Sequence, residues 1–463
     1  DESHNLRNRE GRRYKAIADY VRACDAKVIL LTATPYNKTL TDLSSQLRLF
    51  IEDRANIGIR PEHHIRKNNQ TDAEFERKYQ CPVNSILALE KSDEFDDWRE
   101  LIRLYMVRRT RSFIIQHYAQ QDKKGRSFIT DSTGKQRYFP VRKPVALTFT
   151  IDESDSSDRY ARLYSAQVVD VINDLHLSRY GLGNYIDAQA ARAASPAERK
   201  QIDNLSKAGK RLMGFCRTNL FKRLESSGFS FLQSLQRHIL RNEIYSYAID
   251  NGLDLPIGTL DAGLLDGERV DEDAESLQGD QEDMLDGILE DASENITSQA
   301  EFVYRQYAAE YKKRFKWIRS ALFVPRLREQ LAADTQAIKQ LLTQHGEWKA
   351  AADHKLTALK QFITTTHGKD KILVFTQFAD TARYLARELH KVGIKQMEVV
   401  TGASADPYAA ACRFSPHSNG QTIGKSEEVR VLICTDVLSE GQNLQDCSVV
   451  VNFDLPWAII RLI

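Results

Sequence analysis

The first four residues of the chain, D-E-S-H, constrain its fold more than any other stretch, because of the residues that come after them. A polar segment with helical spacing leads to an apolar run at residues 28–31, which ends directly in T-A-T-P at residues 32–35. A short apolar run bounded by polar residues is typical of a strand buried in a parallel sheet. The alternation of helix and strand over residues 1–150 therefore predicts an α/β domain.

A second set of strands is expected near the C-terminus, over residues 351–463. Apolar runs at residues 371–378 and 429–434 each lead into polar residues, T-Q in the first case and T-D-V-L-S-E-G-Q-N-L-Q in the second. Another strand is expected to end at Val400, and the run at 449–454 leads into L-P-W. With the helix expected over residues 381–391, this pattern predicts a second α/β lobe.

The middle of the chain, residues 151–350, has the spacing of long helices instead. Apolar residues recur at helical intervals between 163 and 175 and again between 221 and 240, in a run that contains the segment K-R-L-E-S-S. Residues 312–317, K-K-R-F-K-W, are basic and aromatic. They are compatible with a nucleic-acid platform, but a helix with its aromatic side chains inward is the favoured interpretation.

An acidic stretch interrupts this helical part. Residues 254–294 contain fifteen acidic residues and one basic residue, a local charge of −14, so the remainder of the chain carries +15 within the net charge of +1. The stretch is predicted to be a flexible loop, because it buries too little apolar surface to offset its ordering entropy. The basic remainder favours a polyanionic partner, with a solvated basic surface as the alternative.

Together these motifs resemble those of superfamily-two helicases and translocases. D-E-S-H and T-A-T-P resemble motifs II and III, and the resemblance implies two RecA-like lobes that use ATP and Mg²⁺. Asp1 would hold the metal, Glu2 would orient the attacking water, and His4 would join Thr32 and Thr34 in linking the nucleotide site to the neighbouring lobe. Phosphoryl transfer requires a metal-binding carboxylate and a water-positioning group of this kind.

The second lobe carries the matching motifs IV and V of the same superfamily. The resemblance implies that Gln377 and Thr435 contact the sugar-phosphate backbone. It also implies that Gly441 allows the loop to pass close to its ligands and that Asn443 lies near the ribose of the nucleotide.

Three segments further resemble the Swi/Snf branch of the superfamily, and the bacterial RNA-polymerase-associated type in particular. They are M-V-R-R-T-R with Arg108, Arg109 and Arg111, the segment K-R-L-E-S-S, and S-E-G-Q-N-L-Q at residues 439–445. This branch implies an ATP-dependent translocase on double-stranded DNA, with the three arginines in contact with nucleic acid. The large helical region would then be an insertion between the two lobes.

The two ends of the chain stop short of other family motifs. The phosphate loop G-x-x-x-x-G-K-[ST] is absent from the 463 residues, and the chain ends before the arginine-rich motif VI. We therefore expect an internal fragment of a larger ATPase that does not hydrolyse ATP alone. A complete protein without ATP binding is the alternative. Two rival functions are the motor of a restriction or phage-defence system, with nuclease or other accessory domains and protein partners, and a non-hydrolysing nucleic-acid scaffold.

Composition limits the cellular setting. The six cysteines show no C-x-x-C pairing, which favours a reducing compartment, and we expect the cytoplasm. No apolar run approaches the roughly 18 residues of a membrane span, so no membrane partner is expected.

Overall fold

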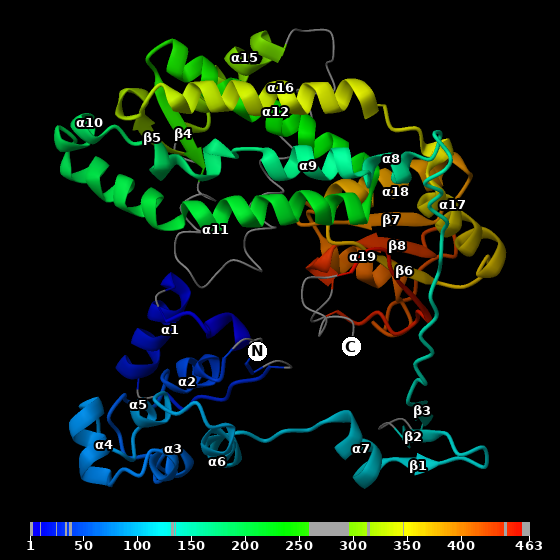
Figure 1. The fold of residues 1–463 in the computed structure, drawn as a ribbon. Coiled ribbons are helices and arrows are strands. Elements are labelled where there is room, and N and C mark those ends of the chain that lie inside the picture. The colour runs from blue at the N-terminus through cyan, green and yellow to red at the C-terminus, as the bar shows by residue number, and fades with distance from the viewer. Residues whose placement is uncertain are drawn as a thin grey trace. The chain divides into compact units, whose positions relative to one another are not determined.

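The structure is a computed structural model, and it describes residues 3–9, 11–24, 26–32, 35–36, 39–130, 134, 136–258, 296–312, 315–345, 347–438 and 442–455 (Figure 1). The chain divides into two compact units, residues 1–144 and 145–463. Each unit is described by itself. Of the helices in the described ranges, none combines the length and the apolar character needed to cross a membrane.

The first unit consists mostly of short helices. Its described helices are the 3-10 helix η1 (Ser3–Leu6), α1 (Arg12–Ala23), α2 (Thr41–Leu47), α3 (Glu62–Lys67), α4 (Asp72–Tyr79), α5 (Ile86–Leu89), α6 (Phe95–Tyr105) and α7 (Arg111–Tyr118). An antiparallel sheet comes next, made of β1 (Gln120–Gln121), β2 (Ser127–Thr130) and β3 (Gln136–Tyr138). The helix expected around Trp98 is confirmed as α6, whose buried residues Trp98 and Leu101 pack in a small core.

The parallel sheet predicted for residues 1–150 is wrong for the described residues of this region. The apolar run at residues 28–31 forms no strand, and Ile29 is 83% exposed. Residues 145–150, the last apolar-rich run of this region, are also without regular structure and largely exposed. A strand needs a neighbour that exchanges backbone hydrogen bonds with it, and no described strand lies beside either run.

The second unit begins with the predicted helical region. Its helices are α8 (Arg159–Leu163), α9 (Ala166–Asp174), η2 (Ser178–Tyr180), η3 (Leu182–Tyr185), α10 (Ala188–Arg192), α11 (Pro196–Ser226), α12 (Gly228–Asp250), α15 (Ile296–Ala309), η5 (Ser320–Leu322), α16 (Arg326–His345) and η6 (Ala350–Ala352). Figure 1 shows α11, α12 and α16 as long rods. The long helices predicted from apolar spacing are thus confirmed.

A helix boundary falls inside the segment that was expected to be continuous. Ser227 has an extended backbone, ends α11, and accepts a hydrogen bond on its side chain from Phe229 N at 3.2 Å, so it caps α12. Serine is among the best N-cap residues because its oxygen satisfies an orphan backbone donor. The turn places the end of K-R-L-E-S-S at the junction of the two longest helices.

One prediction for this region is wrong, and a second is wrong for residues 254–258 alone. Residues 315–319 form the strand β5 (Phe315–Arg319), which pairs antiparallel with β4 (Asp254–Gly258), so K-K-R-F-K-W does not continue as a helix. Ile318 is buried in the core, Phe315 and Trp317 are half-buried against it, and Lys316 is exposed. The start of the acidic stretch is consequently an ordered strand. Residues 259–295, the rest of that stretch, lie outside the described residues.

The second lobe confirms the strands and helices predicted for residues 351–463. Its elements are α17 (His354–Gln361), the π-helix η7 (Phe362–Thr366), β6 (Ile372–Phe375), α18 (Ala379–Lys391), β7 (Met397–Val400), α19 (Pro407–Phe414), β8 (Val431–Cys434), η8 (Asp436–Leu438) and β9 (Val449–Asn452). The four strands are parallel in the order β7-β8-β6-β9. Asp353 caps α17, since its carboxylate accepts from Leu356 N at 2.8 Å.

The helical region and the second lobe share one hydrophobic core. The ring of Phe229, at the start of α12, stacks on Tyr384 of α18 with centroids 4.8 Å apart. Trp348 also packs on this core, and its Nε1 donates to Tyr384 Oη at 2.9 Å. The position of the sheet is therefore fixed by α12 as well as by its own helices.

Candidate nucleotide and nucleic-acid site

The motif residues of the second lobe lie along the carboxyl edge of the parallel sheet. Thr376 follows β6 and its N–H donates to the Cys434 carbonyl at 3.0 Å, while Thr435 follows β8 and donates to the Val400 carbonyl at 3.0 Å. Ligands of open α/β sheets bind outside this edge, where the chain leaves successive strands. The sheet thus brings Gln377 and Thr435 to the same edge.

Asp454 is the centre of a buried polar network at this edge. Its Oδ1 accepts from the Gln377 backbone N–H at 2.8 Å. Its Oδ2 accepts from the hydroxyls of Thr376 and Ser226, which are both buried. Because Ser226 is the last residue of α11, the helical region contributes directly to the hydrogen bonds that hold the Gln377 loop.

The side chain of Gln377 has a polar group that is free to hydrogen-bond with a ligand. Its Oε1 is buried and has no hydrogen-bond partner within the described part of the chain. A buried amide oxygen without a partner is costly, and rotation of the amide presents either the carbonyl or the NH₂ group at the same place. The group can therefore donate to a phosphate oxygen or accept from a hydroxyl.

Thr435 and Asn443, which both follow β8 in the chain, offer two further polar groups in the second lobe. The Thr435 side chain is nearly buried and its hydroxyl makes no hydrogen bond to any residue that the structure describes. Asn443 Nδ2 donates to the Ser418 carbonyl at 2.6 Å, whereas Asn443 Oδ1 is buried with no partner among those residues. An acceptor in that position suits a ribose hydroxyl, which is the role that the resemblance implies.

The loop that carries Asn443 is anchored by a second carboxylate. Asp446 accepts from the backbone N–H groups of His417 and Ser418 at 2.8 and 2.9 Å, and Asn419 Nδ2 donates to the Asn443 carbonyl at 2.8 Å. These bonds fix the loop against the segment after α19. Pre-organisation of this kind lowers the ordering cost of binding a ligand.

A buried ion cluster lies one turn beyond Gln377. Asp380 accepts from Arg237 of α12 at 2.6 and 2.8 Å and from Arg223 of α11 at 2.7 Å. All three side chains are almost fully buried. Burial alone would raise the pKa of Asp380, but the two guanidiniums outweigh it and hold that pKa well below its usual range. The cluster joins both long helices to the start of α18.

Lys355 lies in the segment D-H-K-L at residues 353–356, where the second lobe begins. It also contacts the end of α11, so it belongs to the junction of α11, α12 and α18 with the sheet. Its Nζ donates to the carbonyls of Glu225 and Ser226 at 2.7 and 2.9 Å and lies 4.2 Å from the centroid of the Phe453 ring. Burial lowers the pKa of this lysine to about 8, against the opposing charges of Asp454, Asp353 and Glu225.

This junction is not apparent from the sequence motifs. The sequence marks K-R-L-E-S-S and D-L-P-W only as segments that resemble the family. No motif gives a role to Asp380 or Arg237. Several arginines lie on α11 and α12, and the sequence alone does not tell which of them are buried beside an acidic partner.

In the first unit, the structure brings together part of the predicted motif II and III pair. His4 Nδ1 lies 3.2 Å from Thr32 Oγ1, and Ser3 N donates to the Leu31 carbonyl at 3.0 Å. Ser3 Oγ donates to Gln46 Oε1, and Gln46 Nε2 donates to the Pro35 carbonyl, at 2.7 and 2.6 Å. The D-E-S-H end and the T-A-T-P segment are thus joined by direct and bridged hydrogen bonds.

Four predicted site residues, Asp1, Glu2, Thr34 and Gly441, lie outside the described residues. The roles of Asp1 and Glu2 in Mg²⁺ binding and water activation stay predictions. Elsewhere in the described ranges, no group of three or more His, Cys, Asp or Glu side chains is arranged to hold a metal ion.

The three predicted arginines lie in the first unit, around the start of α7. Arg108, Arg109 and Arg111 are all exposed. Thr110 caps the helix by accepting from Phe113 N at 3.1 Å, so the three guanidiniums flank the positive end of the helix dipole. Cations are unfavourable there, and an anion such as phosphate would relieve the repulsion.

Comparison with known proteins shows what the second lobe is similar to. Residues 354–463 match the family described as the helicase conserved C-terminal domain. This domain is RecA-like, in agreement with the parallel sheet of the second lobe. The match and the similarity to curated helicases support a superfamily-two helicase-like protein.

The relatives are named as helicases. The uncharacterized ATP-dependent helicase YqhH of Bacillus subtilis is 31% identical over 101 residues, which are 20% of this chain and 15% of that protein. The ATP-dependent RNA helicase SrmB of Haemophilus influenzae is 30% identical over 138 residues, 28% of each chain. The ATP-dependent RNA helicase ROK1 of Yarrowia lipolytica is 28% identical over 127 residues, 27% of this chain and 21% of that protein.

The matched part spans only 15% to 28% of the length of these three relatives. No solved structure matches the chain significantly. The relatives do not support the finer Swi/Snf assignment, which stays a prediction.

Proposed function

We propose that this chain forms part of an ATP-dependent nucleic-acid motor. The carboxyl edge of the second lobe would hold the sugar-phosphate backbone through Gln377 and Thr435, and Asn443 in the loop between β8 and β9 would hold the ribose of ATP. The observation that supports this most directly is the pair of buried amide oxygens, Gln377 Oε1 and Asn443 Oδ1, that lack partners among the described residues. Unsatisfied buried acceptors point to groups that a ligand completes.

ATP with Mg²⁺ would supply the free energy and the phosphoryl group for the motor's cycle. Within this chain, Asp1 would hold the metal and Glu2 would orient water. The contact between His4 and Thr32 would tie that end of the chain to the T-A-T-P segment. The proposed cycle is closure of two lobes on ATP, hydrolysis, and reopening one step along the track.

For the track we propose intact double-stranded DNA. The support is the R-R-T-R segment with its exposed arginines, together with the S-E-G-Q-N-L-Q form of motif V, both of which resemble the Swi/Snf branch. A second candidate is an RNA helicase, favoured by the names of two of the relatives. The two activities differ in outcome, since a translocase moves along a duplex and a helicase separates its strands.

The test uses the full-length protein with ATP and Mg²⁺. We expect displacement of a triplex-forming strand from duplex DNA, with a forked DNA duplex and a forked RNA duplex both left paired. Separation of the RNA fork without triplex displacement would overturn the duplex-DNA assignment in favour of the RNA helicase. ATP-independent binding with no hydrolysis in the presence of any nucleic acid would overturn the motor itself.

A further inference from the structure

Residues 106–144, which we call the basic hairpin module, form the most basic surface of the first unit. They contain ten lysines and arginines against two aspartates. All of the described basic side chains in the module are exposed. A cluster of this kind raises the local concentration of polyanions and is the electrostatic footprint of a nucleic-acid site.

The turn of the hairpin is built so that its one described acidic residue does not neutralise the lysines. Asp122 Oδ1 accepts from the backbone N–H groups of Lys124 and Arg126 at 2.8 and 2.9 Å, and its Oδ2 accepts from Arg126 Nε at 2.9 Å. Gly125 supplies the positive φ of 75° that closes this turn. The side chains of Lys123 and Lys124 are exposed and have no ion-pair partner in the described part of the chain.

Aromatic rings alternate with these cations. Tyr118 is 58% exposed at the end of α7, and Tyr138 is exposed on β3. Arg126 lies over the Tyr138 ring at 4.5 Å, and Arg109 lies over the Phe113 ring at 5.6 Å. Proteins that bind single-stranded nucleic acids combine basic grooves with aromatic side chains on which bases stack.

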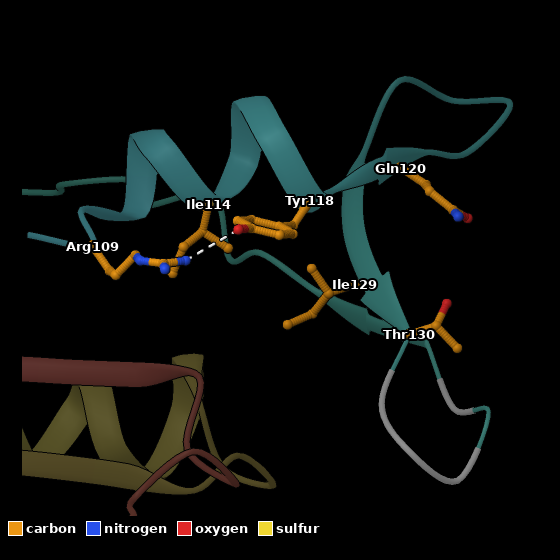
Figure 2. A pocket seen from close by; sticks show the side chains of 6 residues that line it. All are labelled: Arg109, Ile114, Tyr118, Gln120, Ile129 and Thr130. Atoms are coloured by element: carbon orange, nitrogen blue, oxygen red, sulfur yellow. Dashed lines mark hydrogen bonds between the residues drawn. The ribbon is translucent and has the colours of Figure 1, made fainter. Parts of the chain in front are cut away.

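A hollow of about 500 Å³ lies between α7 and the sheet of the module. Figure 2 shows Ile114 of the helix and Ile129 of β2 approaching the same space, with Tyr118 beside them and Arg109 donating to Tyr118 Oη at 3.1 Å. Gln120 and Thr130 add an amide and a hydroxyl to the lining. The hollow is open and its lining mixes apolar and polar groups, and its volume is in the range of small-ligand sites.

We propose that the basic hairpin module is a second nucleic-acid-binding site, in which Lys123 and Lys124 hold phosphates and the hollow beside Tyr118 takes an unpaired base. The apolar floor suits the face of a base, and the Gln120 amide and the Thr130 hydroxyl suit its edge. A base in a duplex is stacked on both faces and cannot offer one to such a hollow, so the site selects single strands. The inference rests on the proposed function in so far as it assumes a nucleic-acid partner.

The phosphate contacts are tested with the complete 463-residue chain by fluorescence anisotropy, with a labelled oligodeoxythymidine and a labelled DNA duplex. Lys123→Ala with Lys124→Ala should lower the salt slope for the single strand by about 1.4, the value for two phosphate contacts. The control, Lys78→Ala with Lys91→Ala, removes two exposed lysines of the same unit outside the module and should leave the slope unchanged. Equal slopes for the wild-type chain and the hairpin variant would overturn the phosphate contacts.

The base contact is tested with Tyr118→Ala, Tyr118→Phe and an abasic strand of the same length. Tyr118→Ala should weaken binding of oligodeoxythymidine roughly ten-fold, as expected for a lost stacking partner, and should not change binding of the abasic strand. Tyr118→Phe keeps the ring and should bind like the wild-type chain. Equal weakening of both strands, or no weakening of either, would overturn the base site.

The two proposals fail in different ways. A chain that binds no nucleic acid at all would overturn both. Binding that Thr435→Val weakens but the hairpin variants leave intact would overturn only the inference about the module. Because Lys123, Lys124 and Tyr118 are exposed, their variants should keep the wild-type melting temperature, which circular dichroism would check.

Discussion

Arginines occur in two contrasting places in this protein. Arg223 and Arg237 are almost fully buried at the junction of α11, α12 and α18, where both donate to Asp380. Arg108 and Arg111 are exposed at the start of α7 in the first unit. The same side chain is therefore a structural element in one region and a candidate ligand contact in the other, and the difference is burial with an acidic partner.

The comparison explains why charge alone did not reveal the role of either pair. A buried guanidinium is tolerated only when carboxylate and hydrogen bonds replace its hydration, and removal of its partner is costly. An exposed guanidinium keeps its hydration and contributes little to stability. We therefore expect the buried pair to control stability and the exposed pair to control binding.

The largest effect is expected from Asp380→Asn, which removes the carboxylate shared by Arg223 and Arg237. The loss leaves two buried cations without this counter-charge, and we expect about 3–5 kcal/mol of destabilisation. Urea unfolding monitored by circular dichroism would measure it.

The matched control is Asp250→Asn, which breaks the bidentate pair with Arg328 at 2.9 and 3.0 Å near the surface of the same unit. We expect a loss of at most about 1 kcal/mol there. Similar losses for the two variants would show that burial does not separate the two classes of arginine.

The second-largest effect on the free energy of unfolding is expected at Lys355. This buried lysine donates mainly to backbone carbonyls at the junction. Its pKa is about 8 in the folded state, below the ordinary value, so folding favours the neutral form. As the pH rises above about 8 the folded protein loses this proton before the unfolded chain does, and stability should increase by about 1.4 kcal/mol per pH unit until the ordinary lysine pKa.

The measurement is the free energy of unfolding of the wild-type chain and of Lys355→Met between about pH 7.5 and about pH 9.5. The free energy of unfolding of the wild-type chain, relative to that of Lys355→Met, should increase as the pH rises. Titration of the other groups affects both proteins equally and cancels in the difference. A difference that is independent of pH would show that Lys355 stays charged at the junction.

A smaller effect is expected from Thr435→Val, which replaces a hydroxyl at the carboxyl edge of β8 and keeps the β-branched shape. We expect roughly five- to ten-fold weaker binding of duplex DNA, about 1 kcal/mol for one lost hydrogen bond, with little change in stability. DNA-stimulated hydrolysis in the whole protein should fall more than basal hydrolysis. Fluorescence anisotropy of the labelled duplex would measure the binding, and unchanged affinity would remove Thr435 from the site.

The second lobe was predictable from sequence because its determinants are local. Each strand is a short apolar run joined at once to the residue that the motif requires, so the parallel sheet brings Gln377 and Thr435 to the same edge. The buried junction was not predictable, because Arg237 and Arg223 are 143 and 157 residues away from Asp380. No local pattern connects residues at that separation.

The wrong predictions for residues 28–31 and 315–319 have a related cause. Residues 315–319 are a strand because β4 pairs with them from far along the chain, although a short basic-aromatic run fits helix and strand spacing about equally well. Residues 28–31 have the composition of a strand, and no described strand pairs with them. A strand depends on its partners, so composition alone misplaces it in both directions.

The smallest effect on stability is expected from Arg108→Ala with Arg111→Ala, and this variant tests the other half of the comparison. Both side chains are exposed and lie at the positive end of α7, so their removal should change the free energy of unfolding by at most about 0.5 kcal/mol, with a slight stabilisation from reduced repulsion. Binding of duplex DNA should nevertheless weaken, with a decrease of up to about 1.8 in the salt slope if both contact phosphate. Unfolding in urea and anisotropy at several salt concentrations would measure the two quantities on the same preparation. Substantial destabilisation with an unchanged salt slope would make these arginines structural, like Arg223 and Arg237, and would remove the contrast between the two regions.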